Sequence, residues 1–374
     1  MTTKNLSYQN SGVNYDLMDP FKKLAQAASL ETIDQIANPE QITEIRKSLG
    51  ESAFIYRLSA DLQLVFVQEG LGTKNLIADR MSELTDKSYY DVVAEDTVAA
   101  IVNDLITVGA KPLIVNAYFG LGNSDWLKDT QKSQDLIAGW KNACLKAGAL
   151  YGGGETPTLQ GIINPETVDL AGSSVGIIEN RKQILGDELA PGDAIILIES
   201  NGIHANGLTL ARKIADELEE GYLTKLSNDD TYGNSLLRPS HIYSKPINDL
   251  LEKKIDINYM VNITGHGWRK LMRSKKDLTY VIDKVPAIDP LFEFIQKNSG
   301  SSDQDMFGTF NMGAGFAIML PEQQADQAIE IINNANYGFK CWLAGKVEAG
   351  DKKVVIKRES KEDIIFNSDS LNIR

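Results

Sequence analysis

A glycine-rich hexapeptide at residues 69–74, EGLGTK, directly follows an apolar run at residues 62–67. Glycines let the backbone approach a ligand closely, and the ammonium group of Lys74 can neutralise phosphate oxygens. The spacing is not GxxxxGK[ST], so the segment is not a Walker A loop. It therefore predicts a phosphate contact of another kind, with a simple glycine-rich turn as the alternative.

Further carboxylates stand at the edges of expected elements. Asp104 lies beside Asn103 inside an expected helix, where both are poor residues. Glu155 follows three consecutive glycines at 152–154, and Asp169 lies near the start of an apolar segment. Such oxygens suit Mg²⁺, which binds through one or two carboxylates plus substrate phosphates. A solvated helix face would explain Asn103 and Asp104 equally well.

Together these segments predict a nucleotide and metal site built without a Walker loop. The predicted metal ligands are Glu69, Asp104, Glu155 and Asp169. The predicted nucleotide contacts in the first half of the chain are Gly70, Gly72, Thr73, Lys74, Asn103, Gly153 and Gly154.

The chain has three histidines, so each can be weighed separately. His204 lies in a Gly/Asn loop before an expected helix, where an imidazole and backbone N–H groups can hold an anion. His266 stands between two glycines, with little side-chain packing next to it in the sequence. We expect functional roles for His204 and His266, whereas His241 is equally compatible with a packed turn.

Composition restricts the class of protein. The 374 residues carry 38 Lys and Arg against 51 Asp and Glu, a net charge of −13, which makes nucleic acid an improbable partner. The polar start lacks an export signal, and the apolar runs are too short to cross a bilayer, so we expect a cytoplasmic protein that does not associate with membranes. Cys144 and Cys341 have neither zinc-ligand nor disulfide spacing.

The order of expected elements indicates an α/β protein of the α+β type with two domains. We expect an N-terminal arm at 1–52, a nucleotide- and metal-binding domain at 53–182, a second α/β domain at 183–348 and a tail at 349–374. Apolar spacing predicts strands at 62–67, 113–118, 168–178 and 194–198, and helices near 96–108, 132–147 and after residue 207.

The ordered motifs resemble the aminoimidazole ribonucleotide (AIR) synthetase family, also called phosphoribosylformylglycinamidine cyclo-ligase. Nine motifs in order over about 315 residues are specific. They are SYQNSGV (7–13), EGLGTK (69–74), VNDLITVGAKPL (102–113), GGGETPT (152–158), VDLAGSSVGIIE (168–179), PGDAIILIESNGIHANGLTLAR (191–212), RPSHIYSKPI (238–247), NITGHG (262–267) and MFGTFNMGAGFAIMLP (306–321).

The resemblance implies a homodimer whose subunits have two domains, each a mixed sheet flanked by helices. ATP would bind between the domains and along the dimer face. The family uses ATP to activate the formyl oxygen of formylglycinamidine ribonucleotide, so that the amidine nitrogen closes an imidazole ring. Phosphoryl transfer of this kind needs positioning and charge neutralisation more than covalent chemistry from the protein.

The family motifs also imply roles for individual residues. Thr73 and Lys74 would contact ATP phosphates, Asp104 and Glu155 would hold Mg²⁺, and Asp169 would add a metal or nucleotide contact. His204 and Asn206 match a His-x-Asn loop that would touch the substrate or the transferring phosphoryl group. The remaining predicted contacts are Thr264 and Gly265 for the nucleotide and His266 for catalysis.

Three departures from the family pattern stand out. Glu69 replaces the usual Asp, Asn262 replaces a His, and His266 takes the middle glycine of ITGGG. Leu49–Arg57 stands where a Gly/Phe-rich segment is typical. These departures leave two alternatives: a related small-molecule phosphotransferase of the thiamine-monophosphate kinase or selenophosphate synthetase type, and a non-catalytic nucleotide-binding relative.

Overall fold

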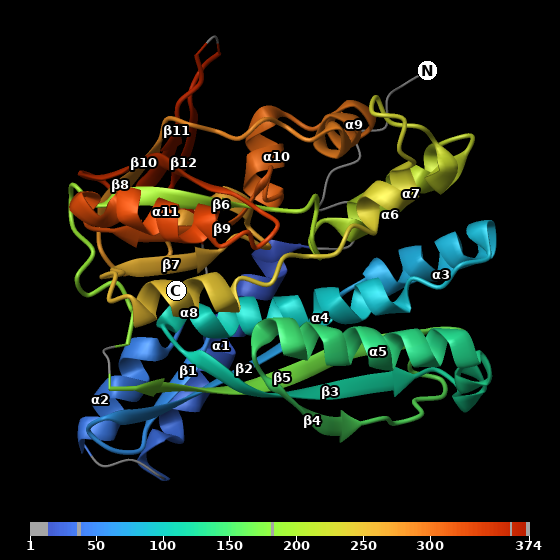
Figure 1. Cartoon of the computed structure of the whole chain (residues 1–374), viewed down its shortest axis with the longest axis horizontal. Helices are drawn as coiled ribbons and strands as arrows, with labels where there is room; N and C mark the ends of the chain where they lie inside the picture. Colours follow the sequence, from blue (N-terminus) through green and yellow to red (C-terminus); the bar gives the residue numbers. More distant parts are fainter. Residues whose placement is uncertain (1–13, 36–38, 181–182, 360, 372–374) are drawn as a thin grey trace.

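The computed structural model describes residues 14–35, 39–180, 183–359 and 361–371, and these form two β-sheets with helices packed between and around them (Figure 1). The SYQNSGV motif lies outside the described residues. The two expected sheets are confirmed, and the mixed α/β architecture agrees with the expected fold class.

The first sheet has five strands in the order β1-β2-β5-β3-β4, antiparallel except for the parallel pair β3/β4. Its strands are β1 Phe54–Arg57, β2 Leu62–Gly70, β3 Lys111–Leu121, β4 Leu150–Glu155 and β5 Val168–Glu179. The helices of this part are α3 Lys74–Thr85, α4 Tyr90–Leu105 and α5 Thr130–Ala147. Helix α5 begins at an Asp129 N-cap and ends at Gly148, which adopts the left-handed conformation expected of a helix-ending glycine.

The second sheet has seven strands in the order β12-β11-β8-β10-β6-β9-β7, antiparallel except for β11/β8. Its strands are β6 Ala194–Glu199, β7 Tyr259–Asn262, β8 Leu278–Ile282, β9 Ala314–Leu320, β10 Cys341–Ala349, β11 Lys353–Ile356 and β12 Ile364–Asn367. The helices are α6 Leu208–Glu217, α7 Tyr232–Leu236, α8 Ser244–Glu252, α9 Pro290–Ser299, α10 Asp303–Thr309 and α11 Ala325–Asn334. The inner strand β9, between β6 and β7, is apolar and buried throughout, as expected for a strand covered on both faces.

Two expectations about the chain are wrong. The segment 349–374 is not a tail without core contacts, because β11 and β12 add two strands to the second sheet. Residues 152–154 do not form a loop, because they lie within the edge strand β4. In both places the strands are short, and flanking charges or glycines hide the alternation on which a sequence-based assignment depends.

Helix α4 positions the site, because it is buried along most of its length between the first sheet and the second half of the chain (Figure 1). Its side toward the first sheet is apolar, whereas Asp96, Asn103 and Asp104 are buried polar residues. Each of them has a hydrogen-bond partner among residues 240–262, and Asp96 is also paired with Lys74 on α3. The polar residues of α4 therefore join the two halves of the molecule.

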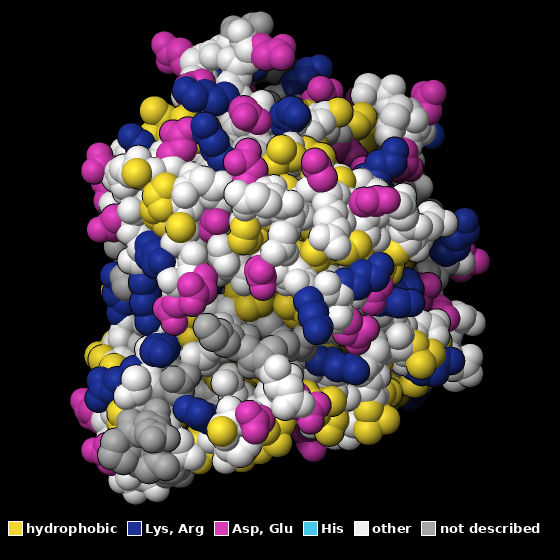
Figure 2. Space-filling view, turned by 60° about the vertical axis from the view of Figure 1, so that its left-hand side comes forward, with side chains coloured by type: hydrophobic (Ala, Val, Ile, Leu, Met, Phe, Trp, Pro, Cys, Tyr) yellow, Lys and Arg dark blue, Asp and Glu magenta, His cyan; other side chains and the backbone are white. Residues whose placement is uncertain are grey.

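At the N-terminal end, α1 spans Tyr15–Glu31 and α2 spans Pro39–Ser48. Acidic and basic side chains are interspersed over the face seen in Figure 2. Within the described ranges, no helix is both long enough and apolar enough to span a membrane.

Candidate functional site

A cavity of about 480 Å³ lies where α1, the end of β2, α4 and the segment after β7 meet. This volume is in the range of small-molecule sites. Seven residues predicted from the sequence line it: Glu69, Gly70, Asp104, Asn206, Thr264, Gly265 and His266. The structure thus brings together residues nearly 200 positions apart in the chain.

Two of the predicted carboxylates, Glu69 and Asp104, line this cavity, and Glu51 lines it as a third. Burial, followed by the negative charge of the neighbouring Asp104 carboxylate, raises the pKa of Glu69 to about 7. Asn262 Nδ2 donates a 2.7 Å hydrogen bond to Asp104 Oδ1. Two carboxylates in one buried region repel each other, so a cation between them is favourable. The donor set therefore fits a hard cation such as Mg²⁺.

The cavity also contains cations that the sequence analysis missed. Lys22 comes from α1, and Lys270 and Arg273 follow the NITGHG motif. Lys270 is 5% exposed, and its Nζ donates to Thr264 Oγ1 at 2.6 Å. Arg273 donates to Gly50 O and Ser52 Oγ and so fixes a segment that also lines the cavity. The sequence does show several basic residues after residue 267, which could have indicated an anion site. A solvent-exposed helix face has the same composition, so the sequence alone does not distinguish the two.

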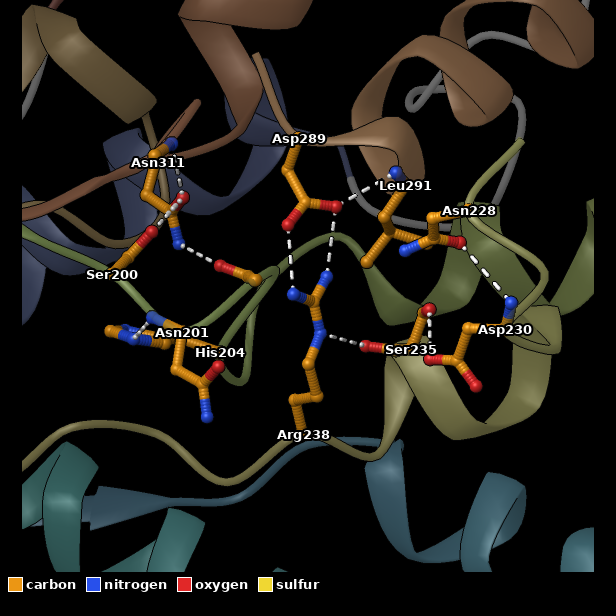
Figure 3. A network of polar contacts seen from close by, with 12 residues as sticks. Ser200, Asn201, His204, Asn228, Asp230, Ser235, Arg238, Asp289, Leu291 and Asn311 are labelled. Atoms are coloured by element: carbon orange, nitrogen blue, oxygen red, sulfur yellow. Dashed lines mark hydrogen bonds and ion pairs between the residues drawn. The ribbon is translucent and has the colours of Figure 1, made fainter. Parts of the chain in front are cut away.

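The loop that carries Asn206 is held by buried hydrogen bonds (Figure 3). Ser200 Oγ donates to Asn311 Oδ1 at 2.9 Å, and Asn311 Nδ2 donates to Gly202 O at 2.9 Å. Gly207, with φ +77°, ends the loop, and a Cβ there would lie 2.1 Å from the Phe310 ring. The loop is therefore fixed on both sides before α6 begins.

His204 is an internal part of this loop. Its imidazole is 4% exposed, and its Nε2 accepts from Asn201 N at 3.2 Å and faces His241 N at 3.5 Å. Burial, followed by the neighbouring His241, lowers its pKa well below the ordinary value. A neutral, buried imidazole that accepts from backbone N–H groups positions the loop. This differs from the predicted contact with substrate.

Lys74 also differs from its predicted role. Its side chain is fully buried, its Nζ lies 2.6 Å from Asp96 Oδ2, and it donates to Arg238 O at 2.8 Å. Arg238 in turn makes a bidentate pair with Asp289 (Figure 3). The ammonium of Lys74 thus joins α3, α4 and the 238–240 segment, and it does not line the cavity.

Asn103 is likewise used for structure. Its Nδ2 donates to His241 O and its Oδ1 accepts from Tyr243 N, at 2.8 and 2.9 Å. Both ends of the amide are therefore occupied within the protein. Gly72, with φ +79°, and Thr73, the residue before α3, also lie outside the cavity lining.

The structure does not gather the four predicted metal ligands. Gly70, Ala171, Tyr118 and Glu155 are paired in one row across β2, β5, β3 and β4. Glu155 is therefore three strand spacings, about 14 Å, from Gly70 at the cavity. Gly153 and Gly154 are exposed on the same edge strand.

Asp169 points away from the cavity. It alternates with the buried residues Val168 and Leu170, so its side chain lies on the face of the sheet opposite to the one that α4 covers. Across the described part of the chain, no group of three or more His, Cys, Asp or Glu side chains could hold a metal ion. Of the four predicted ligands, Glu69 and Asp104 remain at the cavity, and the Glu51 carboxylate, which was not predicted, lines it as well.

His266 adopts a left-handed conformation, φ +68°, that favours glycine. Its Nε2 lies 3.4 Å from Asp19 Oδ2 on α1. Burial, together with the positive charges of Arg269 and Lys270, lowers its pKa to about 3. The imidazole is therefore neutral near pH 7, and it contacts α1 at the cavity wall.

The fold defines a class of two-domain α/β proteins, and in this chain residues of both halves line the cavity. Residues 50–178 match the family described as AIR synthase related protein, N-terminal domain, and residues 190–358 match the corresponding C-terminal domain. The chain belongs to the AIR synthase related protein family.

Curated relatives agree with this assignment. The phosphoribosylformylglycinamidine cyclo-ligase of Carboxydothermus hydrogenoformans is 33% identical over 94% of this chain and 99% of its own length. The enzyme of the same name from Methanobrevibacter smithii is 32% identical over 96% and 100%.

Two solved structures share the fold alone. One is a HypE–HypF complex, with TM-score 0.63, 17% identity, and coverage of 92% of this chain and 99% of that chain. The other is AaThiL complexed with AMPPCP and TMP, with TM-score 0.55, 15% identity, and coverage of 85% and 92%.

Proposed function

We propose that this protein is an ATP-dependent cyclo-ligase that converts formylglycinamidine ribonucleotide to aminoimidazole ribonucleotide in purine biosynthesis. The observation that carries the proposal is the cavity itself. The family motifs EGLGTK, VND, HAN and NITGHG meet there, in a chain that is alignable with named cyclo-ligases over nearly its full length.

In this reaction the formyl oxygen receives the γ-phosphoryl group of ATP, the amidine nitrogen bonds to the formyl carbon, and the oxygen leaves with phosphate. Bound Mg²⁺, held by Glu69 and Asp104, would supply charge neutralisation for the phosphates. Asn262 orients the Asp104 carboxylate through its 2.7 Å hydrogen bond. Asn206 lines the cavity on the loop that Asn311 holds, and in this proposal it would hydrogen-bond the reacting groups.

The protein's own contribution is mainly positioning. Lys270 and Thr264 are hydrogen-bonded to each other on one wall of the cavity. The neutral His266 contacts Asp19 and so holds α1 against another wall. None of these groups needs to form a covalent bond, which agrees with the demands of phosphoryl transfer. A cytoplasmic location, where ATP and this substrate occur, is part of the same proposal.

A homodimer is also part of the proposal, supported by the uncovered face of the first sheet. Phe66, Val175, Ile114 and Leu150 are paired in one apolar row across four strands. Phe66 is 40% exposed and Leu150 64% exposed, whereas α4 covers the opposite face. Asp169 lies on this exposed face. If Asp169 contributes to a site, it would do so in the site of the partner subunit.

The activity is tested by incubating purified protein with ATP, Mg²⁺ and formylglycinamidine ribonucleotide and identifying the products. We expect aminoimidazole ribonucleotide and ADP in equal amounts. ATP consumption without ring closure would contradict the cyclo-ligase assignment, and tight nucleotide retention without turnover would favour a binding protein.

The homodimer is tested separately by light scattering on Phe66→Glu. We expect a monomer at concentrations where the unmodified chain is a dimer, since the new charge would be buried in the interface. Lys128→Met serves as the control, because Lys128 is an exposed surface residue. A Phe66→Glu protein that stays dimeric would place the interface elsewhere.

A further inference from the structure

Three cations line the cavity, Lys22, Lys270 and Arg273, and none of them has yet been given a contact with a ligand. They come from two distant segments, the N-terminal helix α1 and the residues after β7. Burial is the main cause that lowers the pKa of Lys270, and the positive charges of Arg273 and Lys22 lower it further. All three charges therefore lie in one region. Glu69 and Asp104 supply the opposite charge nearby.

Lys270 has hydrogen-bonding capacity that the protein leaves unused. Its ammonium carries three N–H groups, and Thr264 Oγ1 is the one acceptor that it meets among the described residues. Lys74 is the internal comparison, because its equally buried ammonium meets both Asp96 and a backbone carbonyl. Asp104 and Glu69 are the opposite charges nearest in effect to Lys270, but the hydrogen bond of its ammonium goes to Thr264, so N–H groups remain for an anion that enters the cavity.

Helix α1 presents its polar side to the cavity. Met18, Lys22 and Gln26 line it, and Asp19 is buried against His266. The apolar residues Leu17, Phe21 and Leu24 lie on the other side of α1 and are about 70% exposed. Burial of apolar surface would favour the opposite orientation, so the contacts of the polar side with the cavity hold α1 in place.

We propose that Lys22, Lys270 and Arg273 form a subsite for a phosphate monoester, the 5′-phosphate of the ribonucleotide substrate, and that α1 is a wall of that subsite. A phosphate monoester is a dianion with three terminal oxygens, which matches three cations with N–H groups left to donate. The carboxylate pair at Glu69 and Asp104 suits the metal-bound nucleotide instead. The proposal rests on the proposed function for the identity of the substrate.

The probe is ribose 5-phosphate, measured by isothermal titration calorimetry on the full chain without Mg²⁺. Lys270→Met should weaken binding roughly tenfold or more, because a buried charge-assisted hydrogen bond is lost. Lys22→Met should weaken binding by a smaller factor, about threefold, because its side chain is 47% exposed and screened by solvent. Lys23→Met is the matched control, since Lys23 is the exposed neighbour on the same helix and does not line the cavity.

AMPPCP, an ATP analogue, is titrated in a separate series with Mg²⁺ present and should bind the variants as it binds the unmodified chain. Equal losses for both ligands would assign the cations to the nucleotide and overturn the proposal. So would unchanged ribose 5-phosphate binding by the variants, or no binding by the unmodified chain at millimolar concentration. Thermal melts check folding, and Lys22→Met tests the proposal even if Lys270→Met is unstable. Lysine-dependent binding without ring closure would leave the subsite standing and reject the cyclo-ligase.

Discussion

The buried pair Lys74–Asp96 offers the sharpest test of how the site is organised, because the sequence places Lys74 on ATP phosphates and the structure places it between domains. Both side chains are fully buried and lie 2.6 Å apart. Asp96 also accepts from Ser240 N at 2.8 Å. Removing either charge leaves the other buried without its opposite charge, which costs about 3–5 kcal/mol of folding free energy.

Lys74→Met and Asp96→Asn should therefore each lower the melting temperature by roughly 4–6 °C, since 374 residues at about 2.1 cal/mol/K of unfolding entropy each give about 1.3 °C per kcal/mol. The double variant should lose much less than the sum of the two, because neither charge remains. Differential scanning calorimetry with urea unfolding measures both effects. Lys346→Met, which breaks the exposed pair with Glu348, is the control and should cost less than about 1 kcal/mol.

The refuting result is equally specific. Suppose that Lys74→Met melts like the unmodified chain but binds Mg²⁺-ATP at least tenfold more weakly. Lys74 would then contact the ATP phosphates, and the Lys74–Asp96 ion pair would not stabilise the fold. A loss of stability with unchanged nucleotide affinity supports the structural role.

Three further predictions concern the cavity and its support. Asp104→Asn should weaken nucleotide binding about tenfold at limiting Mg²⁺, since it removes a charge from a hard-cation site, and unchanged affinity by calorimetry would contradict this role. Asn311→Ala should lower kcat more than it changes KM, because the loop that carries Asn206 loses its hydrogen bonds to Ser200 and Gly202; a normal kcat in a destabilised protein would show the loop to be dispensable. His266→Gly should make the free energy of unfolding less dependent on pH. The pKa of this imidazole is 6.5 in the unfolded chain and about 3 in the folded protein. Below pH 6.5 the unfolded state therefore binds a proton that the folded state does not, and the folded protein loses stability as the pH decreases. Between pH 7 and 5 the variant should lose about 2 kcal/mol less free energy of unfolding than the unmodified chain, and an identical pH dependence in urea would refute the shift.

Several features of the fold were predictable because their signals are local. The apolar run before EGLGTK predicts β2, the one-sided apolar spacing at residues 136–147 predicts the buried face of α5, and Gly148 predicts its end. The apolar segments at 168–178 and 194–198 predict β5 and β6. The strands β11 and β12 were missed, because four-residue strands between charged segments have too little periodicity to detect.

The candidate site was predictable only in part. Glu69 and Asp104 carry a local signal, a carboxylate at the end of a strand and another in a helix interior, and the structure places both at the cavity. Asp169 has the same kind of signal, yet strand alternation turns it to the opposite face of the sheet. His204 has the residue type of a catalytic group, but packing surrounds its ring with backbone N–H groups.

The sequence by itself determined the family, the strand–glycine loop–helix unit and the order of the motifs, because each depends on residues close together in the chain. The tertiary structure decided which charges meet. Lys74 pairs with Asp96, while Lys22 and Lys270 reach one cavity from segments almost 250 residues apart. That outcome depends on how α4 and α1 pack between the two sheets, and such long-range packing leaves no periodic trace in the sequence.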